Sequence, residues 1–191
     1  MKEVLIKERR ATTRMGSFSP YRTGGYSFYF DGTDDEIAVP DSDDFNMTSG
    51  NGDFTIECWL YVTGSESIKG LIAKRTTGGA ANTNFVIYVD GLKLRSWFSD
   101  GSSYFINDWT TSSDLNANSW NHVAIVRNGT TFTAYANGTQ MGSRTNVSNT
   151  IDSSSRPLFI GCDHPGNVDL NGYISNPVSY THLTLPTKRI V

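Results

Sequence analysis

Cysteine and histidine are scarce in this sequence of 191 residues, which has two cysteines and three histidines. So few thiols exclude a scaffold held by several disulfides, and no Cys and His residues have the spacing of a zinc site. Long apolar runs are missing as well, and none approaches the about 20 residues of a transmembrane helix. The N-terminus also lacks the continuous apolar segment of a secretory signal. The sequence therefore predicts neither a membrane span nor a signal peptide.

Basic residues are few in the central part of the chain. Residues 15–176 contain nine Lys and Arg against seventeen Asp and Glu, which gives a net charge of −8. Such a surface repels a phosphate backbone, so nucleic acid is excluded as a partner. The first fourteen residues have the opposite balance, with five basic and two acidic side chains.

Turn signals are abundant by contrast. Asp-Gly or Asn-Gly pairs occur at 90–91, 100–101, 128–129 and 137–138. These pairs accept the positive φ angles of tight hairpin turns. The clearest case is a pair of runs rich in β-forming residues, 119–129 and 132–138. Each run ends in Asn-Gly, so together they predict a β-meander. No helical period longer than two turns follows residue 10, so we expect an all-β fold.

The meander resembles the laminin G-like modules of the concanavalin A-like lectin and glucanase superfamily. Further matching segments are Tyr26–Thr33 and Ile37–Pro40 as opening strands, Asp53–Leu60 as a core strand, and Pro157–Gly161 and Leu170–Asn176 as late strands. The resemblance covers residues 25–176. It implies a jelly-roll sandwich of two antiparallel sheets.

The same resemblance divides the chain into three parts. Residues 1–24 are expected to form a basic extension and linker in which residues 1–14 add no strand, and residues 25–176 form the sandwich. Past Asn176 the family continues with one more long strand, whereas Val178–Thr187 resembles a translated sequencing adapter. We therefore expect 177–191 to be a non-native tail outside the sandwich, which then lacks its last native strand.

Catalysis is not predicted. Retaining glucanases of the superfamily hold two carboxylates about 5 Å apart, in a pattern that resembles Glu-x-Asp-x-x-Glu on one strand. This chain has five glutamates, at 3, 8, 36, 57 and 66, and none has that spacing. Glu57 stands alone on its strand face, and His122 is interpreted as a packing residue. An accessory fragment of a glycoside hydrolase is the third of three hypotheses.

A carbohydrate site is predicted around the segment 97–109, which mixes aromatic rings with short polar side chains. In this fold, rings stack on the C–H faces of sugars while Asn, Asp and backbone groups bond the hydroxyls. The proposed members are Trp97, Tyr104, Asn107, Asp108 and Trp109. Trp109 is expected to be the solvent-facing platform, whereas Trp97 and Tyr104 could instead fill the sandwich.

A metal site is a weaker prediction. Seven acidic residues lie between positions 31 and 44, among them Asp31, Asp34 and Asp35. Calcium selects dense oxygen ligands and tolerates irregular geometry, although a solvated acidic loop explains the same pattern. In some relatives the resemblance implies calcium held by carbonyls near the Asp31-Gly32 turn and a late-strand Asp, where this chain has Ser175. No cofactor is otherwise expected.

These observations favour a non-catalytic carbohydrate-recognition or adhesion module that binds a glycan or cell-surface polysaccharide. The sequence resembles modules of phage and bacterial surface proteins, which implies a virion-surface or extracellular location and allows a homo-oligomer through a parent protein. The alternative is a purely architectural domain without glycan binding. Cys58 is expected to be a buried free thiol, with a disulfide to Cys162 as the alternative.

Overall fold

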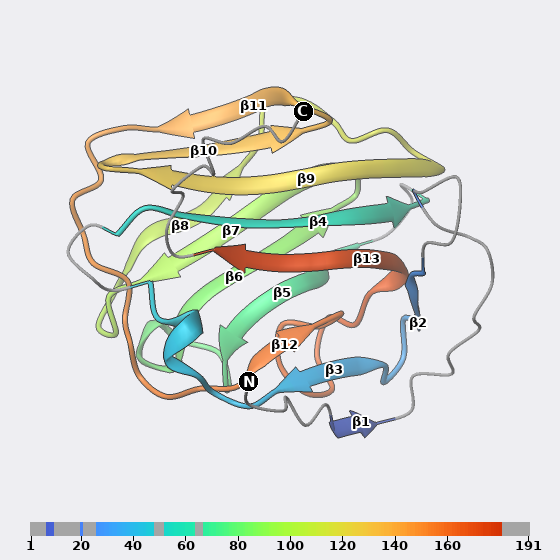
Figure 1. Cartoon of the computed structure of the whole chain (residues 1–191), viewed down its shortest axis with the longest axis horizontal. Coiled ribbons are helices and arrows are strands. Elements are labelled where there is room, and N and C mark those ends of the chain that lie inside the picture. The colour runs from blue at the N-terminus through green and yellow to red at the C-terminus, as the bar shows by residue number, and fades with distance from the viewer. Residues whose placement is uncertain (1–6, 10–19, 21–25, 48–51, 64–66, 181–191) are drawn as a thin grey trace, which may run out of the picture.

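The computed structural model describes residues 7–9, 20, 26–47, 52–63 and 67–180, which form a sandwich of two antiparallel sheets. One sheet has seven described strands in the order β1 (Lys7–Arg9), β3 (Glu36–Val39), β12 (Leu158–Ile160), β5 (Lys69–Arg75), β6 (Thr83–Asp90), β7 (Lys93–Ser99) and β8 (Tyr104–Thr110). The other has six, β11 (Thr139–Arg144), β10 (Thr131–Ala136), β9 (Ser119–Asn128), β4 (Phe54–Val62), β13 (Asn171–Tyr180) and β2 (Phe28–Asp31). The predicted all-β jelly-roll architecture is confirmed, and Figure 1 shows the six-stranded sheet in front of the seven-stranded one.

Helix is almost absent from the described residues. Two three-residue 3-10 turns, η1 (Asp43–Phe45) and η2 (Ala80–Asn82), are the helical elements there. None of the described helices has the length and apolar character needed to cross a membrane.

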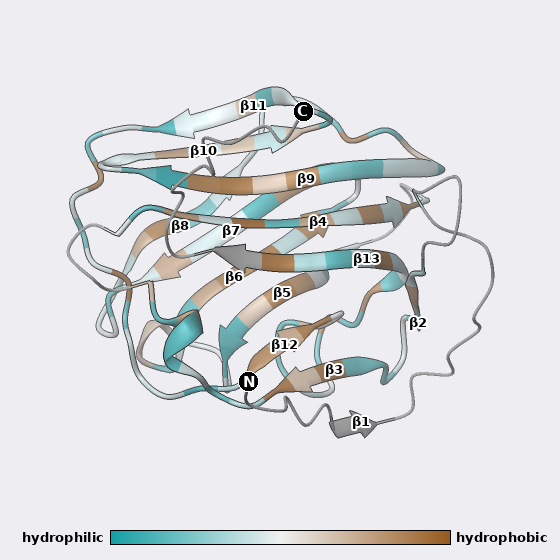
Figure 2. Cartoon of the chain, viewed as in Figure 1, coloured by the Kyte–Doolittle hydropathy of each residue, from teal (hydrophilic) through white to brown (hydrophobic). Residues whose placement is uncertain are grey.

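Strict alternation of side chains creates the core between the sheets. Along β4, Phe54, Ile56, Cys58, Leu60 and Val62 point inward and are at most 2% exposed. The residues between them face outward, as the period of two requires. Figure 2 shows the same alternation along β4, where brown bands are separated by paler and teal ones. Cys58 is thus the buried free thiol that the sequence predicts, and Cys162 is buried and free as well.

Tight turns close the meander, although one differs from the predicted type. Asn137 and Gly138 both have positive φ, 51° and 77°, which fits the expected type I′ turn between β10 and β11. Asn128 instead remains in β9, opposite Thr131, so that Gly129 (φ 57°) and Thr130 occupy the turn. The Asn128-Gly129 pair therefore lies at the chain reversal, but the two turn residues, Gly129 and Thr130, begin one position after the start of the pair.

The N-terminal boundary differs from the prediction that residues 1–14 add no strand. Residues 7–9 form β1, which pairs antiparallel with β3 at Lys7–Ala38, Glu8–Ile37 and Arg9–Glu36. Backbone groups make this pairing, and a charged sequence is well suited to a sheet edge because it discourages further strand addition. The other residues of the 1–24 extension, apart from residue 20, lie outside the described part of the chain.

Strand β13 also runs past the C-terminal boundary predicted at residue 176. β13 continues through Val178, Ser179 and Tyr180, which pair with Glu57, Ile56 and Thr55 of β4. The pairing resumes after a bulge at Asn176 and Pro177, which lie opposite the single residue Cys58. Asn176 adopts φ 46°, and a bulge is one of the few places where a strand accepts proline. Residues 181–191 lie outside the described part.

Two connections between the sheets lie beside each other. The turn from β2 to β3 and the loop from β12 to β13 both pass from one sheet to the other. They are neighbours because β2 pairs with β13 while β3 pairs with β12. This arrangement brings the acidic segment 31–35 next to residues 161–170.

Candidate functional site

The outer face of the seven-stranded sheet carries the aromatic residues of the predicted carbohydrate site. Trp97 on β7 lies between Tyr88 and Tyr104, with ring centroids 5.2 Å and 5.7 Å away. Tyr88 is buried, whereas Trp97 and Tyr104 are partly exposed. The Tyr104 hydroxyl lies 3.2 Å from Thr83 Oγ1, so its ring has a fixed orientation. We call Trp97, Tyr104 and their neighbours on this sheet the β7–β8 face.

Asp108 is the polar centre of this face. Arg95 donates to it through Nε at 2.8 Å and through Nη2, and the Tyr88 hydroxyl also donates to it. Burial raises the pKa of Tyr88, and the hydrogen bond to Asp108 raises it further, so the hydroxyl stays protonated. Asp90 binds the other side of the Arg95 guanidinium. The neighbouring Asn107 is exposed.

A second ion pair borders the ring of Trp97. The Arg75 guanidinium lies 5.8 Å from the Trp97 ring centre and donates to Asp163 at 3.0 Å. Asp163 also lies 2.7 Å from Nδ1 of His164. Both arginines that contact the aromatic rings of this face are therefore paired with carboxylates, so neither offers an uncompensated charge.

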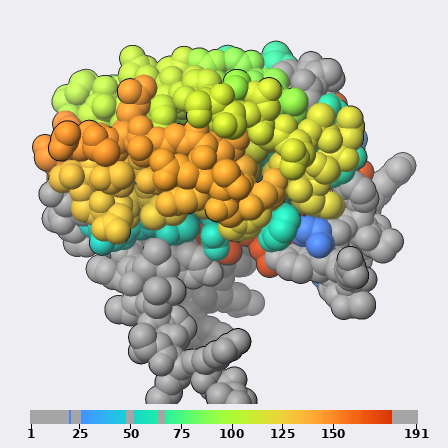
Figure 3. Space-filling view, turned by 90° about the horizontal axis from the view of Figure 1, so that it is seen from above, coloured from blue at the N-terminus to red at the C-terminus, as the bar shows by residue number. Residues whose placement is uncertain are grey.

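Trp109 does not belong to the face, contrary to the prediction. It is 5% exposed and packs in the central core. The cause is a bulge in β8, where Asn107 and Asp108 lie opposite the single residue Trp97, with Asp108 at φ 52°. The extra residue shifts the alternation, so Asp108 points outward and Trp109 inward. Figure 3, seen from above, shows this edge of the sandwich, where orange atoms of the β11 region lie beside yellow-green atoms of the β8 region.

The outer face of the six-stranded sheet carries an aromatic row that the sequence analysis did not single out. Tyr29, Tyr173, Tyr61 and Trp120 follow one another across β2, β13, β4 and β9, with successive centroid distances of 4.9, 6.0 and 5.8 Å. Its signal was the alternation of Trp59 and Tyr61 with the core residues of β4. Cross-strand aromatic pairs of this kind stabilise a sheet.

Glu57 and His122 lie beside the aromatic row. Oε2 of Glu57 is 3.3 Å from Nε2 of His122, and the His122 ring packs on Trp59 at 5.2 Å. The polar group in contact with Glu57 is thus an imidazole, and His122 has the packing role that the sequence predicts.

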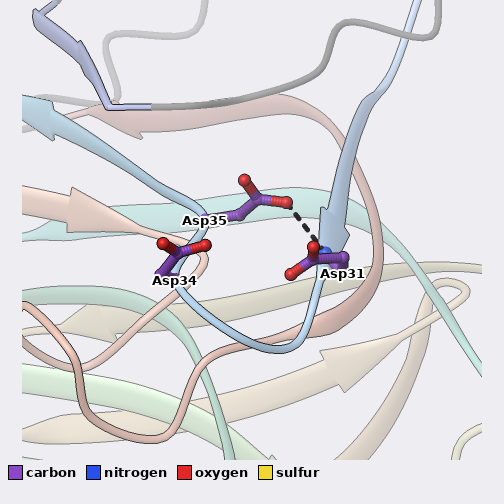
Figure 4. A group of neighbouring side chains, drawn as sticks. All are labelled: Asp31, Asp34 and Asp35. Carbon is purple, nitrogen blue, oxygen red and sulfur yellow. Dashed lines mark hydrogen bonds between the residues drawn. The ribbon is translucent and has the colours of Figure 1, made fainter.

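The acidic turn between β2 and β3 gathers the three predicted metal ligands. Asp31, Asp34 and Asp35 each place a carboxylate oxygen within 4.8 Å of the others, and Figure 4 shows their carboxylates around the turn. Asp35 is 2% exposed and accepts a hydrogen bond from the Asp31 amide at 3.0 Å. Burial raises the pKa of Asp35, and repulsion from Asp31 and Asp34 adds to the effect.

The donor chemistry of this turn fits calcium. Two oxygens on opposite sides of a calcium ion lie about 4.6–5.2 Å apart, twice the usual Ca–O distance, which accommodates the 4.8 Å limit here. Carboxylates are also the ligand type that calcium prefers. Calcium bound there would screen the repulsion among Asp31, Asp34 and Asp35.

The sequence matches a known family over most of its length. The model of the family Laminin_G_3, Concanavalin A-like lectin/glucanases superfamily, matches residues 23–185. The chain belongs to this superfamily. The family match extends beyond residue 176, in agreement with the pairing of residues 178–180, and an adapter origin of the tail finds no support. Comparison with curated proteins found no significant sequence match.

Solved structures share the superfamily sandwich. The binding domain of Paraclostridial Mosquitocidal Protein 1 aligns with a TM-score of 0.64 and 19% identity over 93% of this chain. The binding domain of botulinum neurotoxin DC, solved in complex with rat synaptotagmin II, gives 0.65 and 16% over 92%. The botulinum neurotoxin serotype D binding domain gives 0.60 and 17% over 88%. The chain spans only 42–43% of these domains, and at such identities the likeness shows the fold alone.

Proposed function

We propose that the protein is a non-catalytic carbohydrate-binding module and that the β7–β8 face holds the sugar. The observation that carries the proposal is the pair Trp97 and Tyr104, two partly exposed rings 5.7 Å apart on one sheet face. Aromatic rings offer flat apolar surfaces for the C–H patches of a pyranose. Of the five residues predicted from the sequence, Trp97, Tyr104, Asn107 and Asp108 remain in this site, and Trp109 is removed.

The polar groups of the face favour an uncharged glycan. Arg75 is neutralised by Asp163, and Arg95 by Asp108 and Asp90. An acidic sugar would have to compete with these carboxylates for the arginines, at a cost in desolvation. Exposed Asn107 and the outer oxygens of Asp108 can instead bond sugar hydroxyls.

Membership in a superfamily named for lectins supports binding as the role of the fold. The solved structures of similar fold are named as binding or receptor-binding domains, which supports recognition of a cell-surface molecule. A place on a virion or bacterial surface, as part of a larger protein, is the corresponding proposal for location and rests on the sequence resemblance.

A glycan array followed by calorimetry tests the proposal. We expect neutral glycans to bind in preference to sialylated or uronate-containing ones. Tyr104→Ala should weaken binding at least tenfold, because it removes the ring face that stacks on the sugar and the apolar area buried against it, at about 25 cal/mol per Å². Tyr26→Ala is the matched control, since Tyr26 is 69% exposed and adjoins the other sheet.

Trp97→Phe provides a second variant that keeps an aromatic ring and limits unfolding. Its melting temperature should stay within a few degrees of that of the parent while its affinity falls. If no glycan binds, the module is architectural. Equal affinity of the parent and Tyr104→Ala would place the sugar elsewhere.

A further inference from the structure

The two sheets leave a space between them beside the later part of β13. In the six-stranded sheet, β2 pairs with β13 only along Asn171–Ile174. Beyond Ile174 that edge of β13 has no partner strand among the described residues. Side chains of β3 and β12 in the opposite sheet lie across from this edge, because Val39 and Ile160 line one cavity together with Pro177. The cavity is partly open and has a volume of about 140 Å³.

The lining of this inter-sheet cavity is apolar throughout its described residues. Its floor consists of four aliphatic side chains that are at most 7% exposed, Ile56, Ile72, Leu158 and Ile160. Its mouth consists of four partly exposed residues, Val39, Phe45, Pro177 and Val178. None of these side chains carries a charge or a hydrogen-bonding group. A polar ligand would therefore lose its hydrogen bonds to water without gaining others from the side chains around it.

The volume of the cavity sets it apart from ordinary packing defects. Native cores contain few voids larger than a water molecule. A second interior space of this core, lined by Ile87 and Val123 among others, has a volume of about 10 Å³ and is of that ordinary kind. By contrast, a cavity of roughly 150 Å³ lined by Leu, Ile and Phe side chains stays dry and binds benzene or xenon. The cavity beside β13 has the same size and the same kind of lining.

We propose that the inter-sheet cavity binds a small uncharged apolar molecule, either a six-membered hydrocarbon ring or an alkyl group of similar volume. Such an occupant supplies the dispersion contacts that the floor side chains lack on the cavity side. It enters through the mouth between Phe45 and Pro177. The cavity lies between the sheets, whereas the β7–β8 face lies on the outside of one of them, so the site does not depend on sugar binding.

NMR of the full chain, labelled at the isoleucine δ1 methyl groups, tests the site with benzene as the probe. The ring current of bound benzene should shift the Ile160 methyl resonance, and the shift should saturate as benzene is added. Ile87 is the matched control, because it lines the space of about 10 Å³ and not the larger cavity. Its methyl resonance should stay in place, since that space is too small for a ring.

Filling the mouth should remove the site. Val39→Phe places a ring where benzene would bind, so it should weaken benzene binding at least tenfold while the melting temperature stays at that of the parent or above it. Val126→Phe is the matched control, because Val126 is also a partly exposed valine on a strand but does not line the cavity. This control should bind benzene as the parent does.

Enlarging the floor gives a second test that does not require Val39→Phe to fold. Leu158→Ala should bind naphthalene, which the parent excludes because its cavity holds a single ring. The proposal is overturned if saturating benzene leaves Ile160 unshifted or shifts Ile87 equally. It is also overturned if Val39→Phe binds benzene as tightly as the parent, or if folded Leu158→Ala binds no naphthalene. Failure of glycan binding leaves these results unaffected, so the two proposals fail separately.

Discussion

The indole of Trp109 packs on the backbone of Gly142, and a Cβ built on that glycine would lie 3.5 Å from the ring. Trp109 belongs to β8 of one sheet and Gly142 to β11 of the other. The contact therefore closes the sandwich at one edge. Ser112 reinforces it, since both its amide and its hydroxyl donate to the Met141 carbonyl.

Trp109→Ala should lower the free energy of unfolding by about 3–5 kcal/mol, the usual cost of truncating a buried aromatic side chain. Chemical denaturation measures it. Trp109→Phe should cost less, because it leaves a smaller cavity. If Trp109→Ala leaves the free energy of unfolding nearly unchanged, the Trp109 side chain lies at the surface and not in the core.

Deleting residues 1–9 should lower the free energy of unfolding by about 1–3 kcal/mol, because it removes the backbone pairing of β1 with β3. The exposed edge of β3 should also promote self-association, visible in gel filtration. A deletion of residues 1–6, which retains β1, is the control. Identical stability of the two deletions would contradict a contribution from this strand.

Acid should destabilise the fold through Asp41 and Asp152. Burial alone would raise the pKa of each carboxyl, but Lys74 and Arg156 respectively outweigh it and hold each pKa below the ordinary value of 3.8. Below about pH 5 the unfolded chain starts to bind more protons, so stability falls as the pH drops through 3.8 toward the lowered values. Denaturation curves from pH 6 to 2.5 should show this loss, and Asp41→Asn/Asp152→Asn should flatten it. If stability depends on pH equally steeply in the double variant and in the parent, the two ion pairs are not the cause of the acid destabilisation.

Both thiols should be inert in the native protein. Burial, with a smaller effect of Glu57, raises the pKa of Cys58 to about 12, and burial also raises that of Cys162. A thiol reagent at pH 8 should label neither cysteine until guanidinium is added, and should then label two. Rapid labelling under native conditions would show that one of them opens to solvent.

Asn176→Val should destabilise the protein by about 1–2 kcal/mol, because a β-branched residue resists the left-handed backbone at φ 46°. Asn176→Gly should be close to neutral, since glycine accepts that conformation. Thermal melting distinguishes them. Equal effects of the two substitutions would mean that the bulge is absent in solution.

The fold could be predicted because it follows from repeated local signals. The alternation in β4 and the turn pairs at 128–129 and 137–138 each indicate antiparallel strands without reference to the rest of the chain. The clustering of Asp31, Asp34 and Asp35 likewise follows from a short turn. Such features depend on neighbours in sequence.

The wrong predictions have a different physical origin. Bulges at Asn107-Asp108 and Asn176-Pro177 each insert one residue, which reversed the face of Trp109 and hid the continuation of β13. Their signals in the sequence were Asp108 and Asn176, residue types that tolerate positive φ, but such residues also occur in ordinary turns. The aromatic row of the six-stranded sheet was missed because only the pairing of β2, β13, β4 and β9 brings its rings side by side.

The place of β13 in its sheet bears on the order in which the chain folds. β2 is attached to the six-stranded sheet through β13, which lies between it and β4. During synthesis, β2 emerges early and remains without its neighbour until residues 171–180 have left the ribosome. Contacts between such distant segments slow folding and leave strand edges exposed in the meantime. We therefore expect chains truncated before residue 171 to leave β2 and β4 without the strand that joins them, and to fold incompletely.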